Sequence, residues 1–224
     1  MRKLGTLTIG QAPRSDITPI LDASIGSDLP RRHAGVLDGL SRAEIDRDFA
    51  PQPGAAVLIT KLLDGNSVII DRSHTEAAAQ AKIAMLEAEG CSTILMLCTG
   101  HFESLTASMA QLIEPDRILP PTVAALTQGA QLGIIVPLAE QIASEAGKWA
   151  GLARRPLYAA ASPYGGPGPS LADAARDLAR RGATVLLMDC MGFVEAHRRT
   201  AAEAAKLPVI LSNSLIGKLV SEIA

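Results

Sequence analysis

Residues 90–100 read Gly90-Cys-Ser-Thr-Ile-Leu-Met-Leu-Cys98-Thr-Gly100, and residues 182–192 read Gly182-Ala-Thr-Val-Leu-Leu-Met-Asp-Cys190-Met-Gly192. Both stretches share one pattern: a glycine, seven residues, a cysteine, one residue and a second glycine. In each, the first glycine is typical of a helix end, and the apolar run that follows is typical of a buried parallel strand. The repeat therefore predicts two similar halves, each with a cysteine just past the end of a strand.

The remaining sequence alternates between strand and helix patterns in the same way. Leu4 to Ile9 predicts a first strand, and Gln131 to Val136 begins a second cycle with a similar pattern. We therefore predict an α/β fold of two pseudo-symmetric lobes, each a mainly parallel sheet flanked by helices. Residues 1–119 form the N-terminal lobe, completed by a C-terminal helix at 213–224, and residues 120–212 form the second lobe. The double proline Pro120-Pro121 is taken to mark the passage between them.

Local signals refine this outline. Asp64-Gly65-Asn66 lies between two strand-like runs and predicts a small antiparallel hairpin near residues 57–71. Ser41-Arg-Ala-Glu44 has capping-box spacing for a short helix. Further helices are expected at Ile17 to Ala23, at residues 73–89 with a cap at Ser73, at Ala139 to Trp149, at Leu171 to Arg181 with a cap at Ser170, at Phe193 to Lys206 and at Ser214 to Ile223.

Composition narrows the class of protein. The 224 residues carry a formal net charge of -2 with mixed signs, which argues against a nucleic-acid partner. The first apolar run is far too short to span a membrane, and three cysteines without export signals suggest reduced thiols. We expect a cytoplasmic protein with no membrane partner.

The two cysteines suggest a chemistry through their position. Ligands of parallel α/β sheets bind outside the carboxyl ends of the strands, where both Cys98 and Cys190 fall. A thiol at the start of the next helix would meet backbone N–H groups that favour thiolate and also bind a carboxylate. Either cysteine alone is explained as a small buried apolar residue, but the pair points to a shared cleft between the lobes. There one cysteine would remove an α-proton and the other would return a proton to the opposite face.

With these residues in hand, the chain resembles the AroM family. The similar segments are Leu7-Thr-Ile-Gly10, Arg117-Ile-Leu-Pro-Pro121, Met188-Asp-Cys190-Met-Gly-Phe193 and Leu211-Ser-Asn213. That family is in turn similar to the aspartate/glutamate racemase superfamily, in which each of two α/β lobes contributes a cysteine to the cleft. The resemblance implies that Cys98 and Cys190 are catalytic. The superfamily contains racemases, a maleate isomerase and an arylmalonate decarboxylase, so the resemblance does not fix the substrate.

Other residues of the predicted cleft would contact the substrate. The loop after the first strand often contacts substrate in that superfamily, and there Arg14 can pair with a carboxylate. Asn213 can either bind a ligand or cap the last helix. Asp189, His101 and His197 are weighed as assistants but are read as structural, and Cys91 is read as a packed residue. The predicted substrate-binding residues are Gly10, Gln11, Arg14, Thr99, Gly100, Met191, Gly192 and Asn213.

The sequence thus predicts a cofactor-independent isomerase, a racemase or epimerase of a small carboxylate. No ligand-spaced cluster of cysteine and histidine appears, so we expect no metal, and no glycine motif predicts a nucleotide cofactor. A decarboxylase or a cis-trans isomerase on the same fold remains open, as does a non-catalytic sensor for a small carboxylate or an aromatic metabolite. A homodimer is possible.

Overall fold

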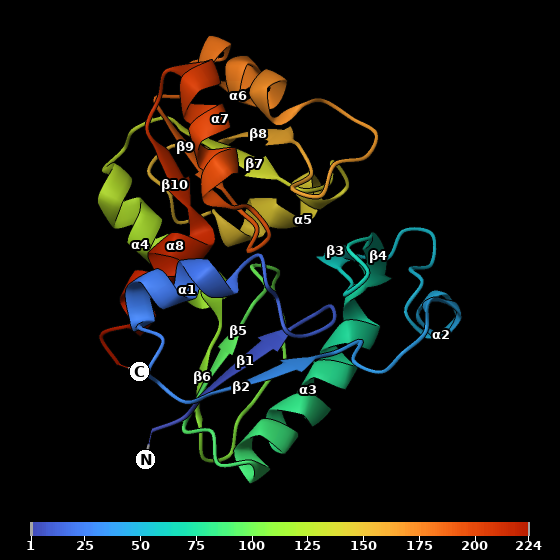
Figure 1. The fold of residues 1–224 in the computed structure, drawn as a ribbon. Helices are drawn as coiled ribbons and strands as arrows, with labels where there is room; N and C mark the ends of the chain where they lie inside the picture. The colour runs from blue at the N-terminus through green and yellow to red at the C-terminus, as the bar shows by residue number, and fades with distance from the viewer. Residues whose placement is uncertain (1, 224) are drawn as a thin grey trace.

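Two four-stranded parallel sheets form the centres of two lobes in this computed structural model, which describes residues 2–223 (Figure 1). The first sheet has the order β2-β1-β5-β6, and the second has the order β10-β9-β7-β8. Their strands are β1 Leu4–Thr8, β2 Arg31–Gly35, β5 Thr93–Met96, β6 Gln111–Ile113, β7 Leu132–Val136, β8 Leu157–Ala160, β9 Val185–Met188 and β10 Val209–Leu211.

The two sheets have equivalent topologies. The first strand of each lobe, β1 or β7, lies between the next strand along the chain and the strand that precedes a cysteine, which is β5 or β9. A short strand, β6 or β10, then closes the far edge beyond β5 or β9. The predicted pseudo-symmetric α/β fold is therefore confirmed, and the cysteines occupy equivalent places in it.

Helices flank both sheets, as strand faces rich in buried apolar residues require. Helix α1 (Thr18–Ile25) packs against α8 (Ser212–Val220) at the junction of the lobes, so the C-terminal helix meets an N-terminal one (Figure 1). The other helices are α2 Arg42–Asp48, α3 Arg72–Ala88, α4 Pro115–Thr127, α5 Gln141–Lys148, α6 Leu171–Arg180 and α7 Glu195–Ala205. None of the helices within residues 2–223 is both long and apolar enough to cross a membrane.

Two of the three predicted serine caps are present at helix starts. The capping box of Ser41 with Glu44 is present, and the Ser170 hydroxyl accepts a hydrogen bond from the Asp173 amide. The cap of α3 is a correction: Asp71, rather than Ser73, accepts hydrogen bonds from backbone N–H groups of the first turn. A carboxylate is a strong cap because it meets the positive end of the helix dipole.

The hairpin of β3 (Val57–Lys61) and β4 (Ser67–Asp71) is confirmed, with antiparallel pairing and a turn that places Gly65 at a positive φ of 89°. The hairpin extends from the N-terminal lobe toward α5 of the second lobe (Figure 1). Its strands alternate buried and partly exposed positions, so one face is available to cover a site between the lobes.

Several connections differ from the prediction. The sequence does not predict strands β2 and β6: β2 is an edge strand with the polar sequence Arg-Arg-His-Ala-Gly, and β6 has only three residues. Pro120 and Pro121 lie inside α4 rather than in a linker, while α4 itself connects the two sheets. The division at residues 119 and 120 remains a prediction.

A candidate active site between the lobes

Cys98 and Cys190 line one small cavity between the lobes, with a volume of about 30 Å³. Cys98 follows β5 of the first lobe and Cys190 follows β9 of the second, so the topological equivalence of the strands brings the two thiols to the same place. Cys98 is 8% exposed, and Cys190 is partly buried. The cavity lies at the carboxyl ends of both parallel sheets, where α/β proteins bind ligands.

Each thiol accepts the same backbone hydrogen bond. The N–H of Gly100 donates to Sγ of Cys98 and the N–H of Gly192 donates to Sγ of Cys190, both at 3.3 Å. The expected position at a helix start is wrong for both cysteines. An irregular segment follows Cys98, and α7 begins only at Glu195. The repeated Cys-x-Gly pattern therefore forms a tight turn, in which the glycine N–H donates to the cysteine sulfur, instead of the start of a helix.

The electrostatics of the free site oppose thiolate formation. Burial raises the pKa of Cys98 to about 12 and that of Cys190 to about 11. The glycine N–H groups partly offset this burial at both sulfurs, and Arg14 lowers the pKa of Cys190 further. The prediction that the fold favours a thiolate is therefore wrong for the free protein. Neither cysteine lies at a helix start, and burial raises the pKa of both.

Arg14 and Tyr164 form the wall beside Cys190. Arg14 is 5% exposed and holds both carboxylate oxygens of Asp16, while its Nη2 donates to the Tyr164 hydroxyl at 3.1 Å. Burial strongly raises the pKa of Tyr164, so its hydroxyl stays protonated. Sequence reasoning missed Tyr164, which lies in the Gly- and Pro-rich loop at 162–169. A lone aromatic in such a loop was the one available signal.

The hairpin forms another wall of the thiol cavity through Leu58, Ile59 and Thr60 of β3. The Thr60 hydroxyl is fully buried and, among the described residues, has no hydrogen-bond partner. The hairpin approaches the loop after β1 so closely that a Cβ at Gly10 would overlap the Lys61 carbonyl oxygen. Gly10 is therefore required for this packing and does not itself line the cavity.

A buried ion pair lies beneath the thiols. Nζ of Lys148 donates to Asp189 Oδ2 and to the Thr99 carbonyl, each at 2.7 Å. Asp189 is 3% exposed, and its Oδ1 has no hydrogen-bond partner in the described part of the chain. The ion pair with Lys148 agrees with the structural role predicted for Asp189, although the residue also borders the thiol cavity.

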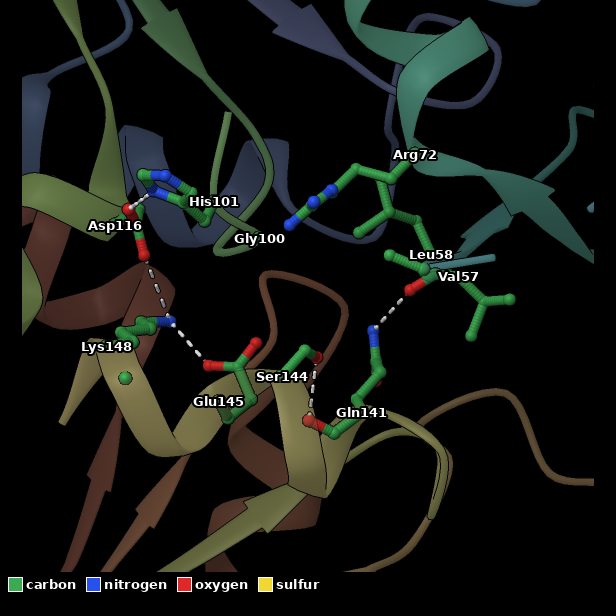
Figure 2. A pocket seen from close by; sticks show the side chains of 12 residues that line it. Val57, Leu58, Arg72, Gly100, His101, Asp116, Gln141, Ser144, Glu145 and Lys148 are labelled. Carbon is green, nitrogen blue, oxygen red and sulfur yellow. Dashed lines mark hydrogen bonds and ion pairs between the residues drawn. The ribbon is translucent and has the colours of Figure 1, made fainter. Parts of the chain in front are cut away.

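A larger cavity of about 420 Å³ adjoins the thiol cavity (Figure 2). The two share Leu58, Gly100, Gln141 and Glu145 as lining residues. Figure 2 shows the Arg72 side chain extending into this space, with Glu145 and Lys148 of α5 on the opposite wall. Burial raises the pKa of Glu145 to about 7, with further contributions from Asp189 and Asp116 that Lys148 partly offsets.

The structure gathers most of the predicted site residues. Arg14, Thr99, Gly100, Met191 and Gly192 line the cavity together with both cysteines. Their contacts with a substrate remain predictions.

Besides Gly10, two predicted substrate contacts lie elsewhere. The Gln11 side chain donates to the carbonyls of Leu37 and Leu40 and accepts from the Leu63 amide, so it anchors the hairpin. Asn213 is fully buried and donates to the carbonyls of Met191 and Phe193, which braces the turn after Cys190. Neither side chain lines the thiol cavity, because the backbone polar groups of the surrounding loops engage both.

The histidines have structural partners. His197 Nδ1 accepts the Val194 amide at the start of α7, and His101 pairs with Asp116 on the rim of the larger cavity. Cys91 is buried in the core of the first lobe, away from the thiol cavity. Within residues 2–223 no group of three or more acidic, cysteine or histidine side chains is arranged to hold a metal ion.

Comparisons with known proteins agree with this architecture. The family model described as AroM protein matches residues 4–224. No curated protein matches the sequence.

Among solved structures, unliganded arylmalonate decarboxylase aligns with a TM-score of 0.58 at 11% identity, over 99% of this chain and 91% of its own. The aspartate racemase of Picrophilus torridus aligns with a TM-score of 0.58 at 12% identity, over 99% and 95% of the two chains. The allantoin racemase of Klebsiella pneumoniae aligns with a TM-score of 0.55 at 12% identity, over 100% and 87%. At these identities the likeness shows a common fold.

Proposed function

Because this chain belongs to the AroM family and has the fold of racemases and of an arylmalonate decarboxylase, we propose that it is a cofactor-independent racemase or epimerase of a small carboxylate. One observation carries the proposal. Cys98 and Cys190 enter a single cavity from equivalent strands of opposite lobes. A carbon atom held between two such sulfurs can lose a proton to one and gain a proton from the other.

The proposed reaction starts from one thiolate and one thiol. The thiolate takes the α-proton, and the electron pair left on carbon is delocalised into the adjacent carboxylate as an enolate. The opposite thiol then donates its proton to the other face of the carbon, so the two sulfurs exchange protonation states. Cys190 is the cysteine more readily ionised to start the reaction, because Arg14 lies beside it and lowers its pKa.

Substrate entry requires the site to open. At about 30 Å³ against about 420 Å³, the thiol cavity is much the smaller of the two, so in this proposal it widens to admit a carboxylic acid between the sulfurs. The adjoining cavity of about 420 Å³ provides a route that passes Gly100 and Glu145. Closure around the substrate then returns the thiols to a water-poor cavity, in which proton transfer is shielded from solvent.

Two groups are available to hold the substrate carboxylate in this proposal. The buried Thr60 hydroxyl has no partner among the described residues, and a bound carboxylate oxygen would accept its hydrogen bond. Arg14 supplies positive charge from the other side, beside Cys190. Together they would orient the α-carbon between the sulfurs.

Exchange of the α-hydrogen in heavy water tests the proposal. The protein is incubated with a panel of 2-substituted carboxylic acids, and loss of the α-proton signal is followed by NMR. A two-base racemase exchanges at least one of these acids and interconverts its enantiomers, and replacing either Cys98 or Cys190 by Ser lowers the rate of interconversion by about 10²-fold or more, the contribution of a general acid or base. Cys91→Ser is the matched control and leaves the rate unchanged. Ligand binding without any exchange rejects the racemase and, where no 2-substituted malonate is turned over either, indicates a sensor.

A decarboxylase on the same site is the second candidate, favoured by the asymmetry of the walls. Arg14 and Tyr164 are both placed to act on Cys190, and a decarboxylase needs one cysteine to protonate the carbanion that remains after loss of carbon dioxide. In that case Cys190→Ser abolishes turnover of a 2-substituted malonate, while Cys98→Ser retains most of it. Equal losses in both variants, with α-hydrogen exchange, identify the racemase instead.

A further inference from the structure

Lys148 contacts the neighbours of both cysteines. Its Nζ donates to the carbonyl of Thr99, the residue after Cys98, and to Oδ2 of Asp189, the residue before Cys190, each at 2.7 Å. Thr99 belongs to the loop that leaves the first sheet, whereas Asp189 directly follows β9 of the second sheet. One ammonium group thus joins the two cysteine-bearing segments across the junction of the lobes.

Further hydrogen bonds converge on the same point. The Thr99 hydroxyl donates to the Asp189 carbonyl at 3.3 Å, which is a second bond between the segments. The indole N–H of Trp149 donates to the same Asp189 oxygen that Lys148 holds, at 3.2 Å, and fixes the orientation of the carboxylate. Asp189 is consequently held from two consecutive residues at the end of α5.

The environment keeps Lys148 charged although its side chain is only 4% exposed. Besides Asp189, carboxylate oxygens of Glu145 and Asp116 lie 3.4 Å and 3.9 Å from Nζ. These carboxylates outweigh the effect of burial and raise the pKa of Lys148. Removing a buried ammonium that is surrounded in this way destabilises the protein strongly, because buried negative charge is left without a partner.

We propose that Lys148 is a positioning residue, a clamp that holds the segments of Cys98 and Cys190 in a fixed relation and keeps the lobes closed over the thiols. It does not touch the reacting carbon. It acts by joining Thr99 to Asp189, so that the two sulfurs face the same cavity. The role deepens the proposed function, and its test below uses no turnover, so a failed clamp and a failed enzyme give separate results.

The test measures the rate at which each cysteine is alkylated. Wild-type protein and Lys148→Met are treated with iodoacetamide under native conditions, and the modification of each cysteine is followed by peptide mass spectrometry. Methionine keeps most of the side-chain volume but cannot donate a hydrogen bond. Cys91, buried outside the cavity, serves as the internal control for general loosening. Arg181→Met is the matched variant, because Arg181 also binds one carbonyl and one carboxylate, those of Tyr158 and Asp177, but within the second lobe.

The clamp predicts that Lys148→Met raises the alkylation rates of Cys98 and Cys190 about tenfold or more and leaves that of Cys91 unchanged, as local opening does. The loss of positive charge by itself would have the opposite effect on alkylation. Lys148 lowers the pKa of Cys98, so its removal leaves less thiolate and slows the alkylation of Cys98. Faster alkylation of Cys98 and Cys190 therefore indicates that the reagent reaches them more easily. Arg181→Met is expected to match the wild type at Cys98 and Cys190.

Two results overturn the proposal. One is wild-type labelling of Cys98 and Cys190 in Lys148→Met, and the other is a parallel rise at all three cysteines, which indicates global destabilisation. If Lys148→Met does not fold, the double variant Lys148→Met/Asp189→Asn removes the shortest ion pair as a unit, while Asp116 keeps His101 as a partner. The same pattern, fast labelling at Cys98 and Cys190 alone, is expected of it.

Discussion

At the scale of single residues, the two thiols differ from a free cysteine in a way that sets their chemistry. Each receives one backbone N–H at 3.3 Å, yet Cys98 is buried and Cys190 partly buried, and burial has the larger effect on both pKa values. Charge on sulfur is therefore costly until a ligand or a motion brings a compensating group. The catalysis that we propose for this pair would therefore depend on the closed complex rather than on the free site.

A pH titration of the free protein checks this view. Since both pKa values lie above the ordinary value of 9.0, thiolate absorbance in the ultraviolet is expected to stay low through pH 9 and to rise near pH 11 to 12 for the two cysteines of the cavity. The Cys98→Ser/Cys190→Ser variant lacks that late rise. Substantial thiolate from position 98 or 190 at pH 7 to 8 contradicts the burial argument.

The sulfurs could be predicted from the sequence, but most of their neighbours could not. Cys98 and Cys190 stand out because the same spacing occurs twice, and spacing is a property of the chain alone. Tyr164 and Lys148 reach the site through side chains from a loop and from the last turn of a helix, and no local pattern distinguishes them. Gln11 was predicted as a ligand contact from its loop, but its amide is used to anchor the hairpin.

At the scale of elements, the β3–β4 hairpin is the most consequential. It covers the thiols, and its attachment to the N-terminal lobe depends on Gln11, whose amide binds the Leu63 N–H and two carbonyls. Gln141 of α5 also donates to the Val57 carbonyl, so the hairpin is bound from both lobes (Figure 2). This arrangement makes the hairpin an element that can open when one attachment is released.

The variant Gln11→Ala isolates the attachment on the N-terminal side. It removes three hydrogen bonds of a half-buried side chain, for which a loss of about 1–2 kcal/mol of local stability is expected. Amide hydrogen exchange of residues 57–71 then becomes faster, while exchange in β7 and β9 is unchanged. Unaltered protection of the hairpin would show that Gln141 and the packing of Leu58 are sufficient to hold it.

At the scale of the whole molecule, the repeated strand order explains why fold prediction succeeded. Periodicity and caps identify strands and helices, and a repeat with equivalent strand order brings two strand ends to one cleft. What periodicity does not contain is the contact between lobes. Lys148 with Asp189, and α8 against α1, join residues far apart in sequence whose partners are chosen by packing. The failure to predict the edge strands β2 and β6 has the same cause. Each becomes a strand by pairing with a neighbour, β1 or β5, and its own sequence does not show that pairing.

Glu145 gives the whole molecule a predictable dependence on pH. Its pKa rises from 4.5 to about 7 on folding, so the unfolded chain loses this proton at a lower pH than the native protein does. Between pH 4.5 and 7 the native state holds more protons at this site, and linkage then requires that this group's contribution to stability falls as the pH rises. Below pH 4.5 the residue is protonated in both states and contributes no dependence.

The variant Glu145→Gln removes that titration and keeps the shape of the side chain. Denaturant unfolding at several pH values is the measurement. Relative to the variant, the wild type is expected to lose unfolding free energy steadily as the pH rises from 4.5 to 7. Gln141→Ala, a change on the same face of α5 that involves no charge, serves as the control and shifts stability by a constant amount. A difference between wild type and Glu145→Gln that is flat across this range, or grows with pH, means that Lys148 holds Glu145 ionised throughout, because an ionised carboxylate beside an ammonium adds stability as the pH rises.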